Sequence, residues 1–410
     1  MKNLKGRAVF AQSGGPTAVI NASVAGGILA ALDNPYITGV LCANHGVKGV
    51  LNEDFFDMNA EDRNEILALK NTPASAFGSV RYKLKDFTVD DTDYKRIIEV
   101  FKKYDVRYFF YAGGNDSMDT CDKISRYAES VGYPVNVIGI PKTIDNDLVG
   151  TDHCPGYGSA AKYVAQSVAE VALDASIYDS PLVIIVEIMG RNAGWLTAAA
   201  SLASLNGSGA DLIYLPEVTF DNDKFIADVK RVVDKKQKCV VAVSEGIRHA
   251  NGKYVGEDAS ATDIFGHSQL GGVCGALKTL VNGAGIKCKA IELNILQRCA
   301  AHCASATDIK EAFNAGEKAL NSAINGETDK MVTFIRKEGN DYDIEYGLSP
   351  LTVTANAEKK IPLEWITECG TALNEKFTNY ALPLIAGEPD ARRENGLISF
   401  AKLRLKKFGI

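Results

Sequence analysis

Two carboxylates, Asp145 and Asp147, are the residues of this chain best suited to chemistry. They follow the apolar run at residues 135–140, which predicts a buried strand. Open α/β sheets bind their ligands at the carboxyl ends of strands, where these side chains would lie. An Asp there can accept a proton from an attacking hydroxyl, while a second Asp holds a metal or orients the first. A polar turn that only caps the next helix is the structural alternative.

Three glycine turns follow other apolar runs. The first is Ser-Gly-Gly-Pro at residues 13–16, where backbone N–H groups and a helix N-terminus can hold an anion. The second is Gly-Gly-Asn-Asp-Ser at residues 113–117, where Asp116 can cap a helix, or Asn115 or Asp116 can offer oxygen to Mg²⁺. The third is Met-Gly-Arg at residues 189–191, whose Arg can bind a phosphate or join a salt bridge.

The elements that must position these residues alternate along the chain. We expect strands at residues 7–12, 37–43, 106–112, 135–140, 182–188, 212–215 and 239–243, separated by helices at 18–32, 116–127, 159–175, 193–204 and 223–235. This order predicts an α/β fold with two doubly wound, mostly parallel Rossmann-like sheets and the active site between them. We expect units at residues 1–150 and 151–325, and a C-terminal extension at 326–410 packed on the core. Within the extension, residues 331–336 and 342–346 predict strands, and 363–374 a helix.

Composition narrows the class of protein. The 410 residues favour two or three domains, and 46% hydrophobic with 23% charged residues is typical of globular chains. A net charge of −6 without a basic block argues against nucleic acid as a partner. Nine cysteines without a C-x-x-C pair predict reduced, mostly buried thiols in a cytoplasmic protein. We find neither a secretory leader nor a run near the ~18 apolar residues of a membrane span.

Taken together, in this order and at these separations, the motifs resemble those of the phosphofructokinase family. The match covers residues 7–323 and includes Ser-Glu-Gly at 244–246 and Gln-Arg at 297–298. The resemblance implies phosphorylation of fructose 6-phosphate on its 1-hydroxyl, with Mg²⁺ as cofactor, in glycolysis or gluconeogenesis. It also implies that residues 1–150 bind the phosphoryl donor and residues 151–325 bind fructose 6-phosphate.

The resemblance further implies roles for single residues. Asp145 would be the general base, assisted by Lys142 and Asp147, and such a base contributes roughly 10²–10⁴-fold to the rate. Asn115 or Asp116 would hold the metal. The sugar phosphate would be bound by Thr143, Ile144, Asp145, Met189, Gly190, Arg191, Glu245, Lys289 and Arg298. The donor would be bound by Gly14, Gly15, Arg81, Asp116 and Lys142.

Asp116 and Lys142 bear on the identity of the donor. At the second turn, ATP-using members of the family carry a sequence similar to Gly-Gly-Asp-Gly-Ser. They usually have a small residue at the position of Lys142. Asp116 occupies space that the α-phosphate and ribose of ATP would need, and Lys142 offers a cation to a small, highly charged anion. The combination resembles the pyrophosphate-dependent members. We therefore expect pyrophosphate as donor and a reversible reaction that gives fructose 1,6-bisphosphate and phosphate.

The chain also departs from the family pattern. Asn115 replaces an expected metal-binding Asp, and Ile295 replaces a His of the sugar-phosphate site. Lys289 and Leu182 stand where the family has arginines. The arginine at position 182 often reaches into the site of a neighbouring subunit. The resemblance implies a homodimer or larger homo-oligomer. The expected helix after the first turn has no basic residue at positions 21–32, which predicts no activation by nucleoside diphosphates.

Three other functions compete with this interpretation. An ATP-dependent phosphofructokinase would use the same site, and donor preference separates the two. A non-catalytic regulatory subunit would be expected to lack Asp145, Arg191 or Glu245, yet all three are present. An unrelated Rossmann-like binding protein would have to carry all the motifs by chance.

Overall fold

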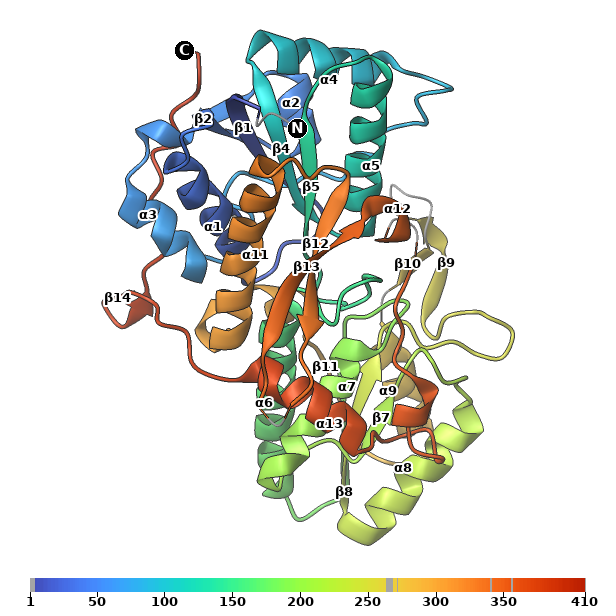
Figure 1. Ribbon diagram of the computed structural model, residues 1–410. Coiled ribbons are helices and arrows are strands. Elements are labelled where there is room, and N and C mark those ends of the chain that lie inside the picture. Colours follow the sequence, from blue (N-terminus) through green and yellow to red (C-terminus); the bar gives the residue numbers. More distant parts are fainter. Residues whose placement is uncertain (1–3, 263–267, 271, 340, 355–356, 410) are drawn as a thin grey trace.

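The computed structural model describes residues 4–262, 268–270, 272–339, 341–354 and 357–409. Two sheets lie one above the other in an elongated molecule, each flanked by helices (Figure 1). This arrangement agrees with the predicted α/β fold of two mostly parallel sheets.

The first sheet has seven strands in the order β13-β12-β5-β4-β1-β2-β3. Its strands are β1 (Gly6–Gln12), β2 (Ile37–Ala43), β3 (Phe55–Asp57), β4 (Val106–Gly113), β5 (Asn136–Pro141), β12 (Lys330–Arg336) and β13 (Ile344–Pro350). The pairings from β12 through β5, β4 and β1 to β2 are parallel, and the two edge strands pair antiparallel.

Two pairs of helices cover the first sheet. Helices α1 (Ile20–Leu32) and α11 (Ala306–Ile324) pack on one face, and α4 (Thr92–Lys103) and α5 (Asn115–Ser130) on the other. Helices α1 and α11 approach closely because glycines face each other across the contact. A Cβ on Gly316 would lie 1.7 Å from the carbonyl oxygen of Ser23, so no larger residue fits there.

The second sheet is smaller and entirely parallel, in the order β11-β6-β8-β7. Its strands are β6 (Leu182–Ile188), β7 (Leu212–Tyr214), β8 (Lys238–Ser244) and β11 (Cys288–Glu292). Helices α6 (Tyr157–Ser176) and α7 (Trp195–Ala198), with the 3₁₀ helix Ala199–Asn206, cover one face. Helices α8 (Asn222–Lys236) and α9 (Val273–Gly283) cover the other. Apolar side chains fill both interfaces.

Short elements complete the described chain. The helices are α2 (Val47–Leu51), α3 (Arg63–Ala68), α10 (Leu296–Cys299), α12 (Leu351–Thr354) and α13 (Glu375–Ala381). The 3₁₀ helices are Met58–Ala60, Leu69–Asn71, Ala301–Cys303, Leu363–Trp365 and Leu382–Ile385. Two hairpins pair β9 (Glu257–Thr262) with β10 (Ser268–Leu270) and β14 (Arg393–Glu394) with β15 (Leu397–Ile398).

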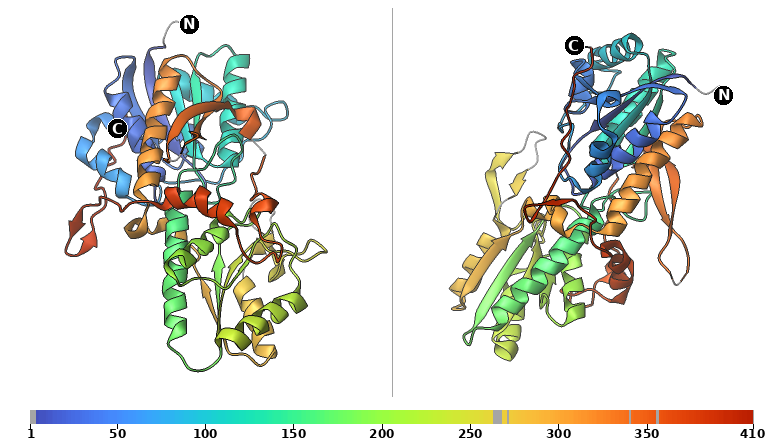
Figure 2. Two further views of the ribbon diagram at one scale, coloured as in Figure 1. Left: turned by 60° about the horizontal axis from the view of Figure 1, so that its bottom comes forward. Right: turned by 90° about the vertical axis from the view of Figure 1, so that its left-hand side faces the viewer.

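The C-terminal part of the chain differs from the predicted division. Strand β12 joins the free edge of β5, with Lys330 opposite Ile138, so the strands expected in the extension belong to the first sheet. The last residues also return to the first half, where the Phe408 N–H donates to the carbonyl of Phe55 (2.9 Å; Figure 2). The units predicted at 151–325 and 326–410 therefore do not coincide with the sheets. Pairing between segments so distant in sequence leaves no periodic signal.

The prediction of a helix at residues 363–374 is also wrong. One 3₁₀ turn, Leu363–Trp365, occupies its start, and α13 begins only at Glu375. The Asn374 side chain accepts a hydrogen bond from the Lys376 N–H (3.0 Å) and caps α13.

All nine cysteines are free thiols, and six of them are buried, as expected. Within the described ranges, we find no helix with the length and apolar character required to cross a bilayer.

Candidate active site

A cleft of about 900 Å³ lies between the two sheets. Its walls begin where β1, β4, β5, β6 and β8 end, as expected for ligand sites of α/β sheets. It brings together fourteen of the residues predicted from sequence: Gly14, Gly15, Arg81, Asn115, Asp116, Lys142, Thr143, Ile144, Asp145, Asp147, Met189, Arg191, Glu245 and Arg298. The four motifs therefore form one site.

The two carboxylates lie on a turn built around Asn146. This residue has φ 55° and is fully buried. Its Oδ1 accepts a hydrogen bond from the Cys154 N–H (2.9 Å), and its Nδ2 donates to the Tyr380 hydroxyl (2.7 Å). Asn tolerates this left-handed conformation better than most residues. With Asn146 directed inward, Asp145 and Asp147 both line the cleft.

The electrostatic environment makes this pair of carboxylates more basic. Burial raises the pKa of both Asp145 and Asp147. Like charges raise it further, because Glu245 acts on Asp145, and Asp145 in turn acts on Asp147. A carboxylate with a raised pKa accepts a proton more readily, so the pair suits general-base chemistry.

Lys142 reaches the first glycine turn from the end of β5. Its side chain is only 4% exposed, and its Nζ donates to the carbonyl of Gly15 (2.7 Å). Burial lowers the pKa of Lys142 to about 8. A Cβ on Gly14 would lie 3.0 Å from this Nζ, and one on Gly15 would lie 3.0 Å from Nη1 of Arg298. Two cations thus converge on the glycine turn, which suits a compact anion of high charge.

Asn115 provides the test of a metal site. Its Oδ1 is buried without a hydrogen-bond partner, and its Nδ2 donates to Oδ2 of Asp147 (3.4 Å). An orphaned amide oxygen beside a carboxylate fits a hard divalent cation. Asp116 lies on the cleft lining with an exposed side chain. Asn115 and Asp147 therefore offer a fitting pair of oxygen ligands; the sequence had suggested Asn115 or Asp116, and the second Asp of the Asp145–Asp147 pair, for a metal.

The opposite wall is the turn after β6. Gly190 has φ 138°, which requires glycine, and its carbonyl accepts from Ser244 Oγ (2.6 Å). Glu245 Oε1 accepts from the Gly190 N–H (3.3 Å), and Gln297 Oε1 from the Met189 N–H (3.2 Å). Gly190 itself does not line the cleft. Its part is to shape the turn from which its neighbours, Met189 and Arg191, do.

Lys289 is a second predicted site residue that does not line the cleft. It is exposed on edge strand β11, opposite Ile184 in the middle of β6, and does not line the cleft. Its Nζ lies 5.3 Å from the ring centroid of Tyr178. The carboxyl edge of the sheet is several residues further along the strand. Lys289 therefore lies outside this cleft, and its role in binding substrate stays a prediction.

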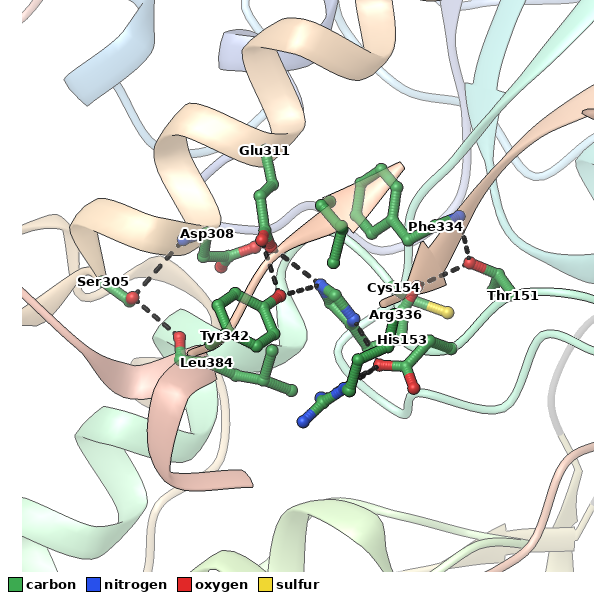
Figure 3. A network of polar contacts seen from close by, with 12 residues as sticks. Thr151, His153, Cys154, Ser305, Asp308, Glu311, Phe334, Arg336, Tyr342 and Leu384 are labelled. Atoms are coloured by element: carbon green, nitrogen blue, oxygen red, sulfur yellow. Dashed lines mark hydrogen bonds and ion pairs between the residues drawn. The ribbon is translucent and has the colours of Figure 1, made fainter. Parts of the chain in front are cut away.

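A buried polar network surrounds His153, six positions after Asp147 in the chain (Figure 3). Nδ1 of His153 lies 2.8 Å from Asp152 Oδ1, and Nε2 lies 2.7 Å from Glu311 Oε2. Tyr342 donates to the other oxygen of Glu311 (2.6 Å), and Arg336 contacts Asp152 (3.0 Å). Burial lowers the pKa of His153, but hydrogen bonds to both carboxylates outweigh this, so the pKa is raised. The network ties the segment that follows the turn to α11, to β12 and to Tyr342, which lies just before β13.

Residues 7–323 match the family described as Phosphofructokinase. The chain belongs to the phosphofructokinase family. This confirms the resemblance found in the motifs. A pyrophosphate–fructose 6-phosphate 1-phosphotransferase of Halomonas elongata is 45% identical over 401 residues, which cover 97% of this chain and 96% of the relative. One of Methylococcus capsulatus is 42% identical over 401 residues, covering 97% and 95%. The crystal structure of a pyrophosphate-dependent phosphofructokinase of Nitrosospira multiformis has a TM-score of 0.89 and 40% identity, covering 98% and 97%.

Cleft residues to which sequence reasoning gave no role include Tyr82, Lys83, Asn192, Tyr254 and Glu358. Lys83 stands two positions after Arg81, so a basic pair on the same side of an extended segment was a usable signal. Asn192 directly follows the Arg of the third motif. Glu358 had no signal, because the segment around it carries no motif and joins the site only through the fold.

Proposed function

We propose that this protein is a pyrophosphate-dependent phosphofructokinase. It transfers a phosphoryl group from pyrophosphate to the 1-hydroxyl of fructose 6-phosphate, giving fructose 1,6-bisphosphate and phosphate, in a reversible reaction of glycolysis and gluconeogenesis. The observation that carries this proposal is the buried Lys142 ammonium at the glycine turn, with Asp116 on the same cleft. The names of the relatives described above support the same donor and the same sugar phosphate.

Asp145 is the general base of this reaction. It accepts the proton of the 1-hydroxyl as the new bond between that oxygen and phosphorus forms. The bond from phosphorus to the bridging oxygen of pyrophosphate breaks, and phosphate leaves. The raised pKa of Asp145 favours proton transfer, which contributes roughly 10²–10⁴-fold to the rate. In the reverse direction the same carboxyl group returns the proton.

The donor lies against the glycine turn at Gly14 and Gly15. Lys142 and Arg298 offer positive charge there, and Arg81 lies on the same cleft. Fixed cations that match the charge of the transferring group stabilise the transition state without reorganising. A nucleotide would need additional space for its α-phosphate and ribose, where Asp116 places a carboxylate. This arrangement favours pyrophosphate over ATP.

Mg²⁺ is the cofactor in this proposal, with Asn115 Oδ1 and Asp147 as the protein groups that would hold it. When bound, the ion neutralises charge on the phosphoryl oxygens. Asn115 gives the site one negative charge less than an Asp would. The site relies on Asp147 for the negative charge that it offers.

The sugar phosphate faces the opposite wall, which is formed by Met189, Arg191 and Glu245, and Arg298 of the same cleft binds its 6-phosphate. Burial raises the pKa of Glu245, which keeps this carboxyl suited to hydrogen bonding with sugar hydroxyls. The free thiols support a cytoplasmic location. We also propose a homodimer or larger homo-oligomer, as the family suggests. We propose that ADP does not activate the protein, because α1 carries no basic residue.

The reverse reaction tests this proposal. Purified protein is incubated with Mg²⁺, fructose 1,6-bisphosphate and inorganic phosphate, and fructose 6-phosphate is followed through coupled isomerisation and oxidation. We expect fructose 6-phosphate and an equal amount of pyrophosphate. Formation of fructose 6-phosphate that requires ADP and yields ATP would contradict the proposal and favour the ATP-dependent alternative. A protein inactive with every donor would favour the regulatory subunit, although Asp145, Arg191 and Glu245 all line the cleft.

A further inference from the structure

Residues 357–361, here called the strap, lie between the two halves of the molecule (Figure 1). The Lys359 N–H donates to the carbonyl of Asp147 (2.7 Å). On the other side, the Trp195 indole N–H donates to the Lys359 carbonyl (2.8 Å), and the Ile361 N–H donates to Glu217 (3.2 Å). The strap backbone is thus hydrogen-bonded to the turn that carries Asp145. It is also hydrogen-bonded to the half of the molecule that carries Met189, Arg191 and Glu245, here called the sugar wall.

The Lys359 side chain strengthens this connection. Its Nζ donates to the carbonyls of Thr151 (3.1 Å) and Asp152 (2.6 Å) and lies 5.2 Å from the ring centroid of Trp195. An ammonium that holds two carbonyls and an aromatic face fixes the segment that follows the Asp145–Asp147 turn. The strap is therefore a well-anchored base for the residue beside it.

That residue is Glu358, which lines the cleft. Its Oε1 accepts a hydrogen bond from Asn192 Nδ2 (2.6 Å). Asn192 Oδ1 accepts in turn from Arg248 Nη2 (3.0 Å), and the Arg248 guanidinium lies 4.1 Å from the ring centroid of Tyr254. The Asn192 amide is held at both ends, and Asn192 is the neighbour of Arg191 on the sugar wall.

The presence of the Glu358 carboxylate on the cleft wall requires a physical explanation. The cleft takes two polyanions in the proposed function, and a further negative charge on its wall opposes their binding. A short hydrogen bond that joins two walls of the site offsets such a cost. The pKa shifts of Asp145 and Asp147 also indicate that Glu358 lies near them. Burial is the largest cause that raises both pKa values, and the negative charge of Glu358 is one of the further causes.

We propose that Glu358 is a positioning residue for the sugar-phosphate site. It holds Asn192, and with it the turn that carries Arg191, at a fixed distance from the Asp145–Asp147 turn to which its own strap is bonded. This inference rests on the proposed function, because it assigns fructose 6-phosphate to that wall. The hydrogen-bond acceptor of Glu358, and not its charge, carries the role.

The variants Glu358→Ala, Glu358→Gln, Asn192→Ala and the double Ala variant test this role, with Glu364→Ala as a matched control. Glu364 is an exposed acid of the same segment that does not line the cleft. We expect Glu358→Ala and Asn192→Ala each to raise KM for fructose 6-phosphate about three- to tenfold, with a smaller change in kcat. Glu358→Gln keeps an oxygen acceptor for Asn192 and should stay within about twofold of wild type. The double variant should be no worse than Asn192→Ala alone, because Asn192→Ala already removes the contact with Glu358.

Two results would overturn the inference. One is an unchanged KM for fructose 6-phosphate in Glu358→Ala. The other is Glu358→Gln as impaired as Glu358→Ala, which would assign the role to charge. Calorimetric titration of fructose 6-phosphate without any donor separates this inference from the proposed function. Weaker binding in Glu358→Ala supports the positioning role even if the donor proves to be ATP, and equal binding in wild type and variant contradicts it.

Discussion

The ammonium of Lys142 donates a hydrogen bond to the carbonyl of Gly15 at 2.7 Å, across 127 positions of the chain. This contact joins the end of β5 to the glycine turn that follows β1. It places a buried cation at the donor side of the cleft before any ligand binds. A charge held in place in advance needs no reorganisation during the reaction, which is the property that the proposed donor site requires.

The first prediction concerns donor choice. Replacing Asp116→Gly and Lys142→Gly together removes the carboxylate from the ATP side and the cation from the pyrophosphate side. We expect the ratio of kcat/KM for pyrophosphate to that for ATP to fall. Lys85→Ala with Asp90→Ala removes an exposed ion pair of the same half and should leave the ratio unchanged. An unaltered ratio in the glycine double variant would refute the steric and electrostatic account of donor choice.

The second prediction concerns the general base. Asp145→Asn keeps the shape of the side chain but cannot accept the hydroxyl proton. We expect kcat to fall roughly 10²–10⁴-fold, with KM for fructose 6-phosphate changed much less. Steady-state kinetics at saturating pyrophosphate provide the measurement, and equal melting temperatures establish that the variant is folded. If kcat stays within tenfold of wild type, another group takes the proton.

The third prediction is a bell-shaped pH dependence of kcat/KM for pyrophosphate. The base must be ionised, and burial raises its pKa, so activity should decline on acidification at a higher pH than an ordinary carboxylate would give. Burial lowers the pKa of Lys142 to about 8, so its charge, and activity with it, should be lost as the pH rises past that value. Lys142→Arg, which stays charged, should move the alkaline limb upward. A profile that is flat to pH 10 would contradict this role for Lys142.

Much of this site follows from sequence because its parts are local. Each motif is a strand followed at once by its functional residues, and parallel strands bring their carboxyl ends to one edge. Lys142 and Asp145 could therefore be placed before the structure was known. Glu358 could not, because only the path of the strap brings it to the cleft. The position of Lys289 away from that edge could not be foreseen either, because the motifs do not reveal its register on β11.

The fourth prediction concerns the metal. Asn115→Asp restores a negative charge beside Asp147 and should lower the Mg²⁺ concentration needed for half-maximal activity, about three- to tenfold. Asn115→Ala removes the orphaned oxygen and should raise it. Titration with Mn²⁺ followed by electron paramagnetic resonance gives a readout independent of turnover. Equal Mn²⁺ affinity in all three proteins would remove Asn115 from the metal site.

The fifth prediction concerns the buried His153 network (Figure 3). His153→Gln should lower the melting temperature and reduce the free energy of unfolding by about 1–3 kcal/mol. Because the folded pKa of His153 is raised, its charged form stabilises the fold fully below the unfolded value of about 6.5, and that contribution is lost as the pH rises through the folded pKa. The difference between wild type and variant in calorimetry should therefore be larger at pH 6 than at pH 9. A larger difference at pH 9 would mean that the imidazole is neutral in the folded protein.

The most direct test of donor identity is an initial-rate comparison on the purified wild-type protein. Fructose 6-phosphate and Mg²⁺ are supplied with either pyrophosphate or ATP, and fructose 1,6-bisphosphate is followed through aldolase. The geometry of Lys142, Asp116 and the glycine turn predicts turnover with pyrophosphate and none with ATP. Turnover with ATP and none with pyrophosphate would contradict the account.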